Sequence, residues 1–98
     1  MSTATKPNVD VKTRLTPRYK VIGHNDDVTP MDFVVQVFVE IFKKSEYDAI
    51  QVMIEIHKSG TGIVDVLPLE VAELRVEQCH SMARARKFPL TLTLEPAD

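Results

Sequence analysis

Apolar residues follow two different spacings along this chain, and these spacings predict three strands and three helices. The segment 18–23, RYKVIG, has the alternation of a strand, and 90–94, LTLTL, alternates strictly between apolar and polar residues. The apolar run 63–67 comes directly after Gly60 and Gly62 and predicts a short strand between two helical segments.

The first helical pattern covers residues 30–44. Thr29 and Pro30 are typical of a helix start, and Asp32 has the spacing of a capping-box acid, so Thr29 is the expected N-cap. The apolar positions form a stripe that should face the core: Val34, Val37, Phe38, Ile41 and Phe42.

Two further helices are expected, the second to about residue 58 and the third over about 68–87. Ser45 and Asp48 repeat the capping-box spacing, and Gly60 ends the second helix. The apolar positions of the third helix that can reach the core are Val71, Ala72, Leu74, Val76, Cys79, Met82 and Ala83.

The predicted order of elements is strand, helix, helix, strand, helix, strand. We therefore expect an α+β fold, a single small domain with a three-stranded, mainly antiparallel sheet covered by three helices. Residues 1–17 are polar and carry two prolines, which predicts a flexible arm ahead of a folded domain at 18–98.

Composition narrows the possible functions. A net charge of −2 argues against a nucleic-acid-binding protein, which usually presents a basic face. No apolar run approaches the about 20 residues that span a bilayer, and one cysteine indicates a reducing, cytoplasmic compartment. Cys79 and His80 are neighbours on a predicted helix, so their side chains diverge and cannot act as a catalytic pair.

Candidate chemistry gathers in residues 24–34. Asn25, Asp26 and Asp27 are turn formers with oxygen-bearing side chains, and the apolar Met31 and Val34 follow closely. Hydrogen-bond acceptors beside an apolar hole would suit a ligand that carries a cation next to an apolar group.

Other interpretations of the polar residues remain open. A histidine near a helix end, such as His57, is more often structural, unless the Met53 face of its helix lines the same hole. A metal-dependent hydrolase could use His24, Asp26, Asp27 and His57, although their spacing matches no metal motif. A structural interaction module without N-terminal residue specificity is the third hypothesis.

Taken together, several segments resemble the bacterial Clp protease adaptor family, ClpS. The resemblance covers residues 18–95, and the asparagine–aspartate–aspartate turn combined with the spaced methionine and histidine is its specific part. The segments that carry it are Tyr19-Lys20-Val21-Ile22, Asn25-Asp26-Asp27, Thr29-Pro30-Met31, Phe33-Val34, Met53, Ile56-His57, Glu70-Val71-Ala72-Glu73 and Pro89-Leu90 with Leu94-Glu95.

The resemblance implies an adaptor of the N-end rule pathway, not an enzyme, with no cofactor and no metal. Such proteins bind proteins that begin with Leu, Phe, Tyr or Trp and deliver them to the ClpA unfoldase for degradation by ClpP. The arm 1–17 would take part in delivery.

Family roles can be carried onto matching positions of this sequence. Asn25, Asp26 and His57 would bond the α-amino group, and Asp27 would support the turn. Glu70 and Arg75 would dock the unfoldase. The expected walls of the side-chain pocket are Thr29, Met31, Val34, Met53, Ile56 and Leu90.

The chain departs from the family pattern at two positions. Pro68 stands where the family commonly has a capping Thr. Ile56 replaces a frequent Val, and its extra methylene is expected to narrow the pocket.

Overall fold

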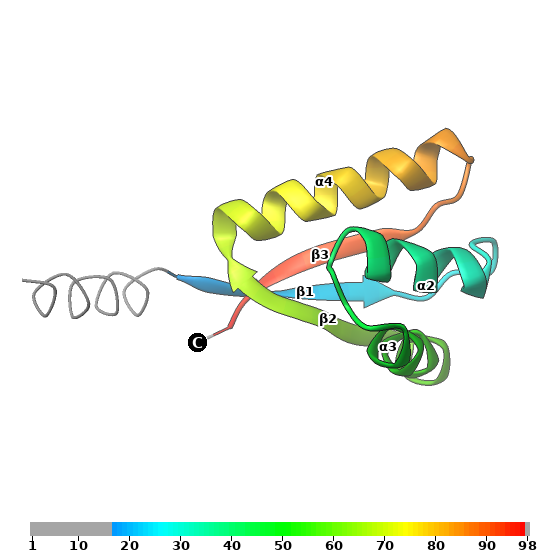
Figure 1. Ribbon diagram of the computed structural model, residues 1–98, viewed down its shortest axis with the longest axis horizontal. Coiled ribbons are helices and arrows are strands. Elements are labelled where there is room, and N and C mark those ends of the chain that lie inside the picture. The colour runs from blue at the N-terminus through cyan, green and yellow to red at the C-terminus, as the bar shows by residue number, and fades with distance from the viewer. Residues whose placement is uncertain (1–16, 98) are drawn as a thin grey trace, which may run out of the picture.

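The computed structural model describes residues 17–97, so the predicted arm, apart from Pro17, lies outside the described residues. Three strands form one antiparallel sheet in the order β2-β1-β3. The strands are β1 (Arg18–His24), β2 (Thr61–Pro68) and β3 (Thr91–Pro96). The helices are α2 (Met31–Glu40), α3 (Glu46–Ser59) and α4 (Leu69–Ala85). The predicted order of elements and the α+β class are confirmed (Figure 1).

The central strand β1 sets the geometry of the molecule. It begins beside the end of β2 and runs toward the turn that leads into α2 (Figure 1). Gly23 on β1 pairs with Gly62 on β2, while the register shifts by one residue between Val21 and Ile22. This shift is a bulge, which increases the local twist of a strand pair.

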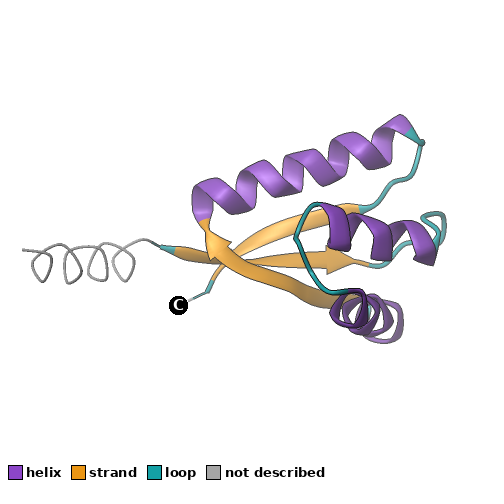
Figure 2. Cartoon of the chain, viewed as in Figure 1, coloured by secondary structure: helices purple, strands orange, loops and turns teal. Residues whose placement is uncertain are grey.

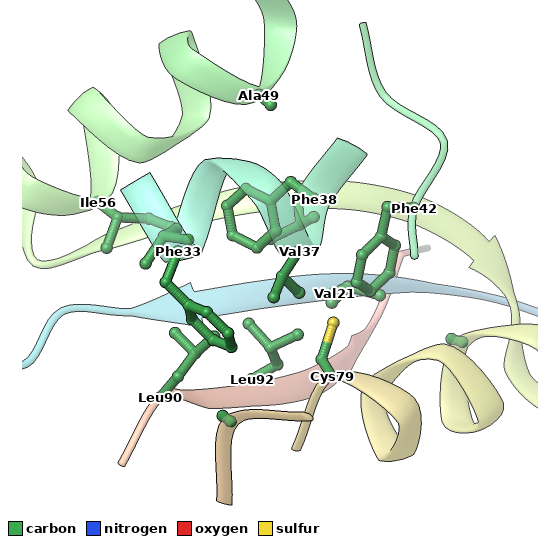
Figure 3. Close-up of a cluster of buried hydrophobic side chains, with 14 residues drawn as sticks. Val21, Phe33, Val37, Phe38, Phe42, Ala49, Ile56, Cys79, Leu90 and Leu92 are labelled. Atoms are coloured by element: carbon green, nitrogen blue, oxygen red, sulfur yellow. The ribbon is translucent and has the colours of Figure 1, made fainter. Parts of the chain in front are cut away.

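The core lies between one face of the sheet and the helices that cover it (Figure 2). Side chains alternate across the strands, so Leu92 on β3 is buried while Thr91 and Thr93 are exposed. Figure 3 shows Ile56, Phe33 and Leu90 at one end of the cluster and Phe42 and Cys79 at the other. The buried residues are Val21, Phe33, Val34, Val37, Phe38, Phe42, Ala49, Ile56, Val64, Ala72, Cys79, Ala83, Leu90 and Leu92.

The first helix differs from its prediction at both ends. Pro30 is the N-cap of α2 and no side chain caps the helix, so the prediction of a Thr29 cap is wrong. The Asp32 carboxylate accepts from the adjacent Phe33 N–H at 2.9 Å instead of reaching back. The helix ends before the predicted Lys44 because Lys43 adopts a left-handed backbone, with φ of 58°.

The second helix begins and ends where Ser45 and Gly60 predict. Ser45 is the N-cap of α3, and its hydroxyl accepts from the Asp48 N–H at 3.1 Å. Gly60 follows the helix with φ of 90°, the left-handed conformation that ends many helices, and donates to the Ile56 carbonyl at 2.9 Å.

The third helix presents less of its apolar surface to the core than expected. Val71 and Leu74 are 36% and 54% exposed, so the prediction that they reach the core is wrong. Cys79 is fully buried, as predicted, and desolvation raises the pKa of its thiol to about 12. Among residues 17–97, no helix has both the length and the hydropathy needed to cross a membrane.

Candidate functional site

A hollow opens where the turn after β1 meets α2, α3 and the segment before β3. About 30 Å³ of it admits the centre of a water molecule, and the empty space is about 320 Å³ when the open solvent at its mouth is included. Every residue predicted to bind an α-amino group or to wall a side-chain pocket lies around it. The lining residues are His24, Asn25, Asp26, Thr29, Met31, Val34, Met53, Ile56, His57 and Leu90.

The polar side of the hollow is organised by the Asp26 carboxylate. Its Oδ1 accepts from the Val28 N–H at 2.8 Å and from the Thr29 N–H at 2.7 Å. Its Oδ2 accepts from the Thr29 hydroxyl at 2.8 Å. These bonds explain why Thr29 does not cap α2, because its hydroxyl is directed to the preceding turn instead.

The pKa of the Asp26 carboxyl reflects opposing influences. Desolvation tends to raise it, but the N–H groups of Thr29 and Val28, the Thr29 hydroxyl and the positive charge of Arg84 together hold it below its usual value. The carboxylate is therefore ionised at neutral pH and can face a cation.

Asp27 was expected to support the turn, but the side-chain hydrogen bonds within the turn are accepted by Asp26. Asp27 is exposed, and among the described residues its carboxylate accepts none of the hydrogen bonds that hold the turn. Sequence alone could not separate the two aspartates, because both are equally good turn formers.

One backbone hydrogen bond ties the turn to α3. The Asn25 N–H donates to the Gly60 carbonyl at 2.9 Å, so the turn lies against the C-terminal end of α3. His57 is in the last turn of that helix and borders the hollow beside Asn25 and Asp26. Met53, on the same face of α3 as His57, also lines the hollow. This is the arrangement in which His57 is a candidate ligand-binding residue and not only a structural histidine.

The apolar side of the hollow has a buried floor and an accessible rim. Val34, Ile56 and Leu90 are 8%, 5% and 1% exposed, so the floor belongs to the hydrophobic core. Met31 is 47% exposed and Met53 is half-buried, which places flexible thioether side chains where a ligand would enter.

Arg84 supports the floor, and sequence analysis missed this role. Its Nη1 donates to the carbonyls of Phe88 and Leu90, both at 2.8 Å. These bonds shape the connection between α4 and β3 that delivers Leu90 to the hollow. The only signal in the sequence is a basic residue near a helix end, which the helix dipole favours and which does not indicate a contact with the following segment.

His24 is a second residue that the site prediction did not include. It borders the hollow at the end of β1, and its Nε2 lies 2.7 Å from the Thr93 Oγ1 on β3. From the sequence, His24 is a candidate only as a metal ligand. Within residues 17–97, no three His, Cys, Asp or Glu side chains are grouped closely enough to hold a metal ion.

The two residues expected to dock an unfoldase lie away from the hollow. Glu70 is exposed in the first turn of α4, and Arg75 is half-buried further along the same helix. The first turn of α4 follows β2 at the end of the sheet opposite the turn at 25–29 (Figure 1). Two separate surfaces are therefore available at opposite ends of β1.

Comparisons with known proteins agree with this arrangement. Residues 14–93 match the family model described as ATP-dependent Clp protease adaptor protein ClpS. The chain is 46% identical over 78 residues to the ClpS adapter protein of Oleidesulfovibrio alaskensis, an overlap of 80% of this chain and 75% of the relative. The ClpS adapter protein of Bdellovibrio bacteriovorus is 48% identical over 81 residues, which are 82% of this chain and 71% of the relative.

A solved structure shows the same fold with a ligand. It is Agrobacterium tumefaciens ClpS2 bound to L-phenylalaninamide, with a TM-score of 0.79 and 34% sequence identity. The match covers 83% of this chain and 98% of that protein. The fold, the family model and the sequence relatives lead to one conclusion: this chain belongs to the ClpS family of ATP-dependent Clp protease adaptor proteins.

Proposed function

We propose that this protein is a non-catalytic, cytoplasmic adaptor of the N-end rule pathway. It binds proteins whose first residue is Leu, Phe, Tyr or Trp and delivers them to a ClpA-type unfoldase for degradation by ClpP. The observation that carries the proposal is the combination of an ionised carboxylate and a core-like apolar floor in one hollow.

The polar side suits the free α-amino group of a chain terminus. An ammonium that leaves water needs acceptors for its three N–H donors, and the Asp26 carboxylate, the Asn25 amide oxygen and the His57 imidazole are acceptors of this kind. Hydrogen bonds to charged groups contribute about 1.5–3 kcal/mol each. An internal residue of a chain has no ammonium, so the site selects termini.

The apolar side suits the first side chain. Burial of a Leu or Phe side chain contributes about 1.5–3 kcal/mol, which together with the ammonium contacts offsets the cost of association. The thioethers of Met31 and Met53 at the rim disfavour side chains branched at Cβ, which would place bulk beside them. The L-phenylalaninamide bound by the A. tumefaciens relative combines a free amino group with a benzyl side chain, and this supports the proposal.

Delivery requires a second contact, for which Glu70 and Arg75 are the candidates. Glu70 is in the first turn of α4, beside the end of β1 opposite the hollow, and Arg75 follows along the same helix. Neither residue lines the hollow, so an unfoldase bound to them would leave it open. Charge reversal at both positions, Glu70→Lys with Arg75→Glu, should stop ClpAP degradation of a substrate that begins with Phe while peptide affinity is kept. Glu70→Lys alone should show the same loss, and its matched control is Glu95→Lys on the exposed surface of β3, because both single variants replace an exposed glutamate by lysine.

The experiment that tests the proposal is a fluorescence anisotropy titration with labelled peptides that differ only in the first residue. Peptides with N-terminal Leu, Phe, Tyr or Trp should bind, and those with Ser, Asp or Val should bind at least about tenfold more weakly. Equal affinity for all first residues would overturn the proposal and favour an interaction module that does not select N-terminal residues.

A further inference from the structure

Gly23 and Gly62 face each other on neighbouring strands and both lie directly beneath Ile56 of α3. They are Cα partners in the β1–β2 ladder, and both are buried. A methyl group on Gly23 would lie 2.6 Å from the Cδ1 of Ile56. A methyl group on Gly62 would lie 2.9 Å from the Cγ1 of the same residue.

Backbone conformation does not explain why glycine occupies positions 23 and 62. Gly60 is the glycine with positive φ among residues 17–97, and neither Gly23 nor Gly62 has a left-handed backbone. What both positions require is space, because the end of the Ile56 side chain occupies the volume that a Cβ atom would need. The pair therefore forms a notch in the sheet, and we use this name for Gly23 and Gly62 together.

The notch changes the interpretation of Ile56. Its extra methylene, relative to Val, was expected to narrow the pocket. The Cδ1 atom of Ile56 is the atom nearest to the Cβ position of Gly23, so the extra methylene is in contact with the sheet. The side chain is 5% exposed, so most of its surface is buried in the notch and the core.

We propose that the Gly23–Gly62 notch seats Ile56 and thereby sets the depth of the hollow, which makes Gly23 a determinant of the N-terminal side chains that the site accepts. This inference rests on the proposed function. A side chain at Gly23 would also meet Leu92 and Val64 at 3.4 Å, an ordinary contact distance, so Ile56 is the neighbour that has to move. The empty space that Ile56 borders is the hollow, and its displaced methyl would reduce the hollow's volume.

The test compares peptides with N-terminal Trp, Phe and Leu on four proteins: wild type, Gly23→Ala, Ile56→Val and the double variant. Gly23→Ala should weaken the binding of the Trp and Phe peptides about tenfold more than the binding of the Leu peptide. A difference of one methylene in an apolar pocket changes relative affinity by about this factor. The double variant removes the Cδ1 atom that the new methyl meets, so its ratio of affinities should equal that of Ile56→Val alone. Ile56→Val alone is the reference for the double variant, because Ile56 belongs to the floor of the hollow and its replacement acts on the affinities by itself.

Cys79→Ala is the control for lost stability, because Cys79 is buried in the core and does not line the hollow. It should leave the affinity ratio at the wild-type value. If Gly23→Ala fails to fold while the double variant folds, the added methyl at position 23 and the Cδ1 of Ile56 compete for one space. This result would support the inference that the notch seats Ile56. An unchanged ratio in folded Gly23→Ala would overturn the inference. So would a double variant whose ratio differs from that of Ile56→Val alone as strongly as the ratio of Gly23→Ala differs from that of the wild type.

A second measurement separates failure of the inference from failure of the proposed function. Wild-type protein that binds none of the peptides would remove the proposed function. The contact between Ile56 and the notch is then tested by methyl NMR of the protein without any peptide. Nuclear Overhauser contacts between the Ile56 δ-methyl and the Gly23 α-protons are expected in wild type, and their absence would overturn it.

Discussion

The hydroxyl of Thr29 donates a hydrogen bond to Oδ2 of Asp26 over 2.8 Å. Together with the two backbone N–H groups on Oδ1, this bond fixes the carboxylate at the edge of the hollow before any ligand arrives. A charge that is already oriented does not have to be ordered when a cation binds, and this reduces the cost of association.

Replacement of Asp26 by Asn should weaken peptide binding while the fold is kept. The amide retains an oxygen for the turn but carries no charge, so the ammonium loses a charge-assisted contact of about 1.5–3 kcal/mol, an affinity loss of about 10- to 150-fold. Anisotropy titration measures the affinity, and circular dichroism checks the fold. Asp27→Asn removes the same charge from the next, exposed residue and should change affinity by no more than about twofold. Equal losses in both variants would contradict the assignment to Asp26.

Replacement of Arg84 by Gln should loosen the floor of the hollow. The variant loses the two carbonyl contacts that hold the chain at Phe88 and Leu90, with an expected decrease in the free energy of unfolding of about 1–2 kcal/mol, because Arg84 is exposed and its bonds compete with water. Urea denaturation measures this loss. Lys87→Gln, an exposed charge in the same connection, is the control and should have a much smaller effect. The prediction fails if both variants unfold at the same urea concentration.

The free energy of unfolding should decrease in mild acid because His80 is protonated more readily in the unfolded chain than in the fold. Its Nε2 accepts the Leu92 N–H at 2.9 Å, which requires an unprotonated nitrogen. Desolvation, and to a lesser degree the charge of Arg84, lower the His80 pKa below its ordinary value of 6.5. The unfolded chain therefore takes up a proton first as pH falls, so the free energy of unfolding is unaffected well above pH 6.5 and decreases as pH drops from 6.5 toward the lowered pKa.

The measurement for His80 is urea unfolding at a series of pH values from about 7.5 to 5. His80→Gln keeps an acceptor for the Leu92 N–H but does not titrate in this range, so its stability should fall less steeply. A pH dependence identical to that of the wild type would assign the loss to other groups.

Local signals in the sequence were sufficient for much of the fold. Ser45 caps α3 and Gly60 ends it because each acts on backbone groups a few residues away. The strict alternation of residues 90–94 likewise places Leu92 in the core. Where two local interactions competed, the pattern could not decide between them. Thr29 had the signature of a cap, yet its hydroxyl bonds to Asp26.

Contacts between distant segments limited the prediction of the site. The resemblance named the residues that line the hollow, whereas periodicity alone could not bring His57 to Asn25. That approach depends on the backbone bond from Asn25 to Gly60. The direction of the Ile56 methyl depends in the same way on a glycine of another element, so its expected narrowing effect could not be judged from residue size alone.

The central claim is that the hollow captures the free amino group of a chain terminus together with the first side chain. Isothermal titration of L-phenylalaninamide and of its N-acetyl derivative into the 98-residue chain tests this claim most directly. The two ligands share the benzyl group, but acetylation removes the ammonium that Asp26 would hold. We predict measurable heat of binding for the free amine and none for the acetylated compound. Comparable affinity for the two compounds would contradict the account.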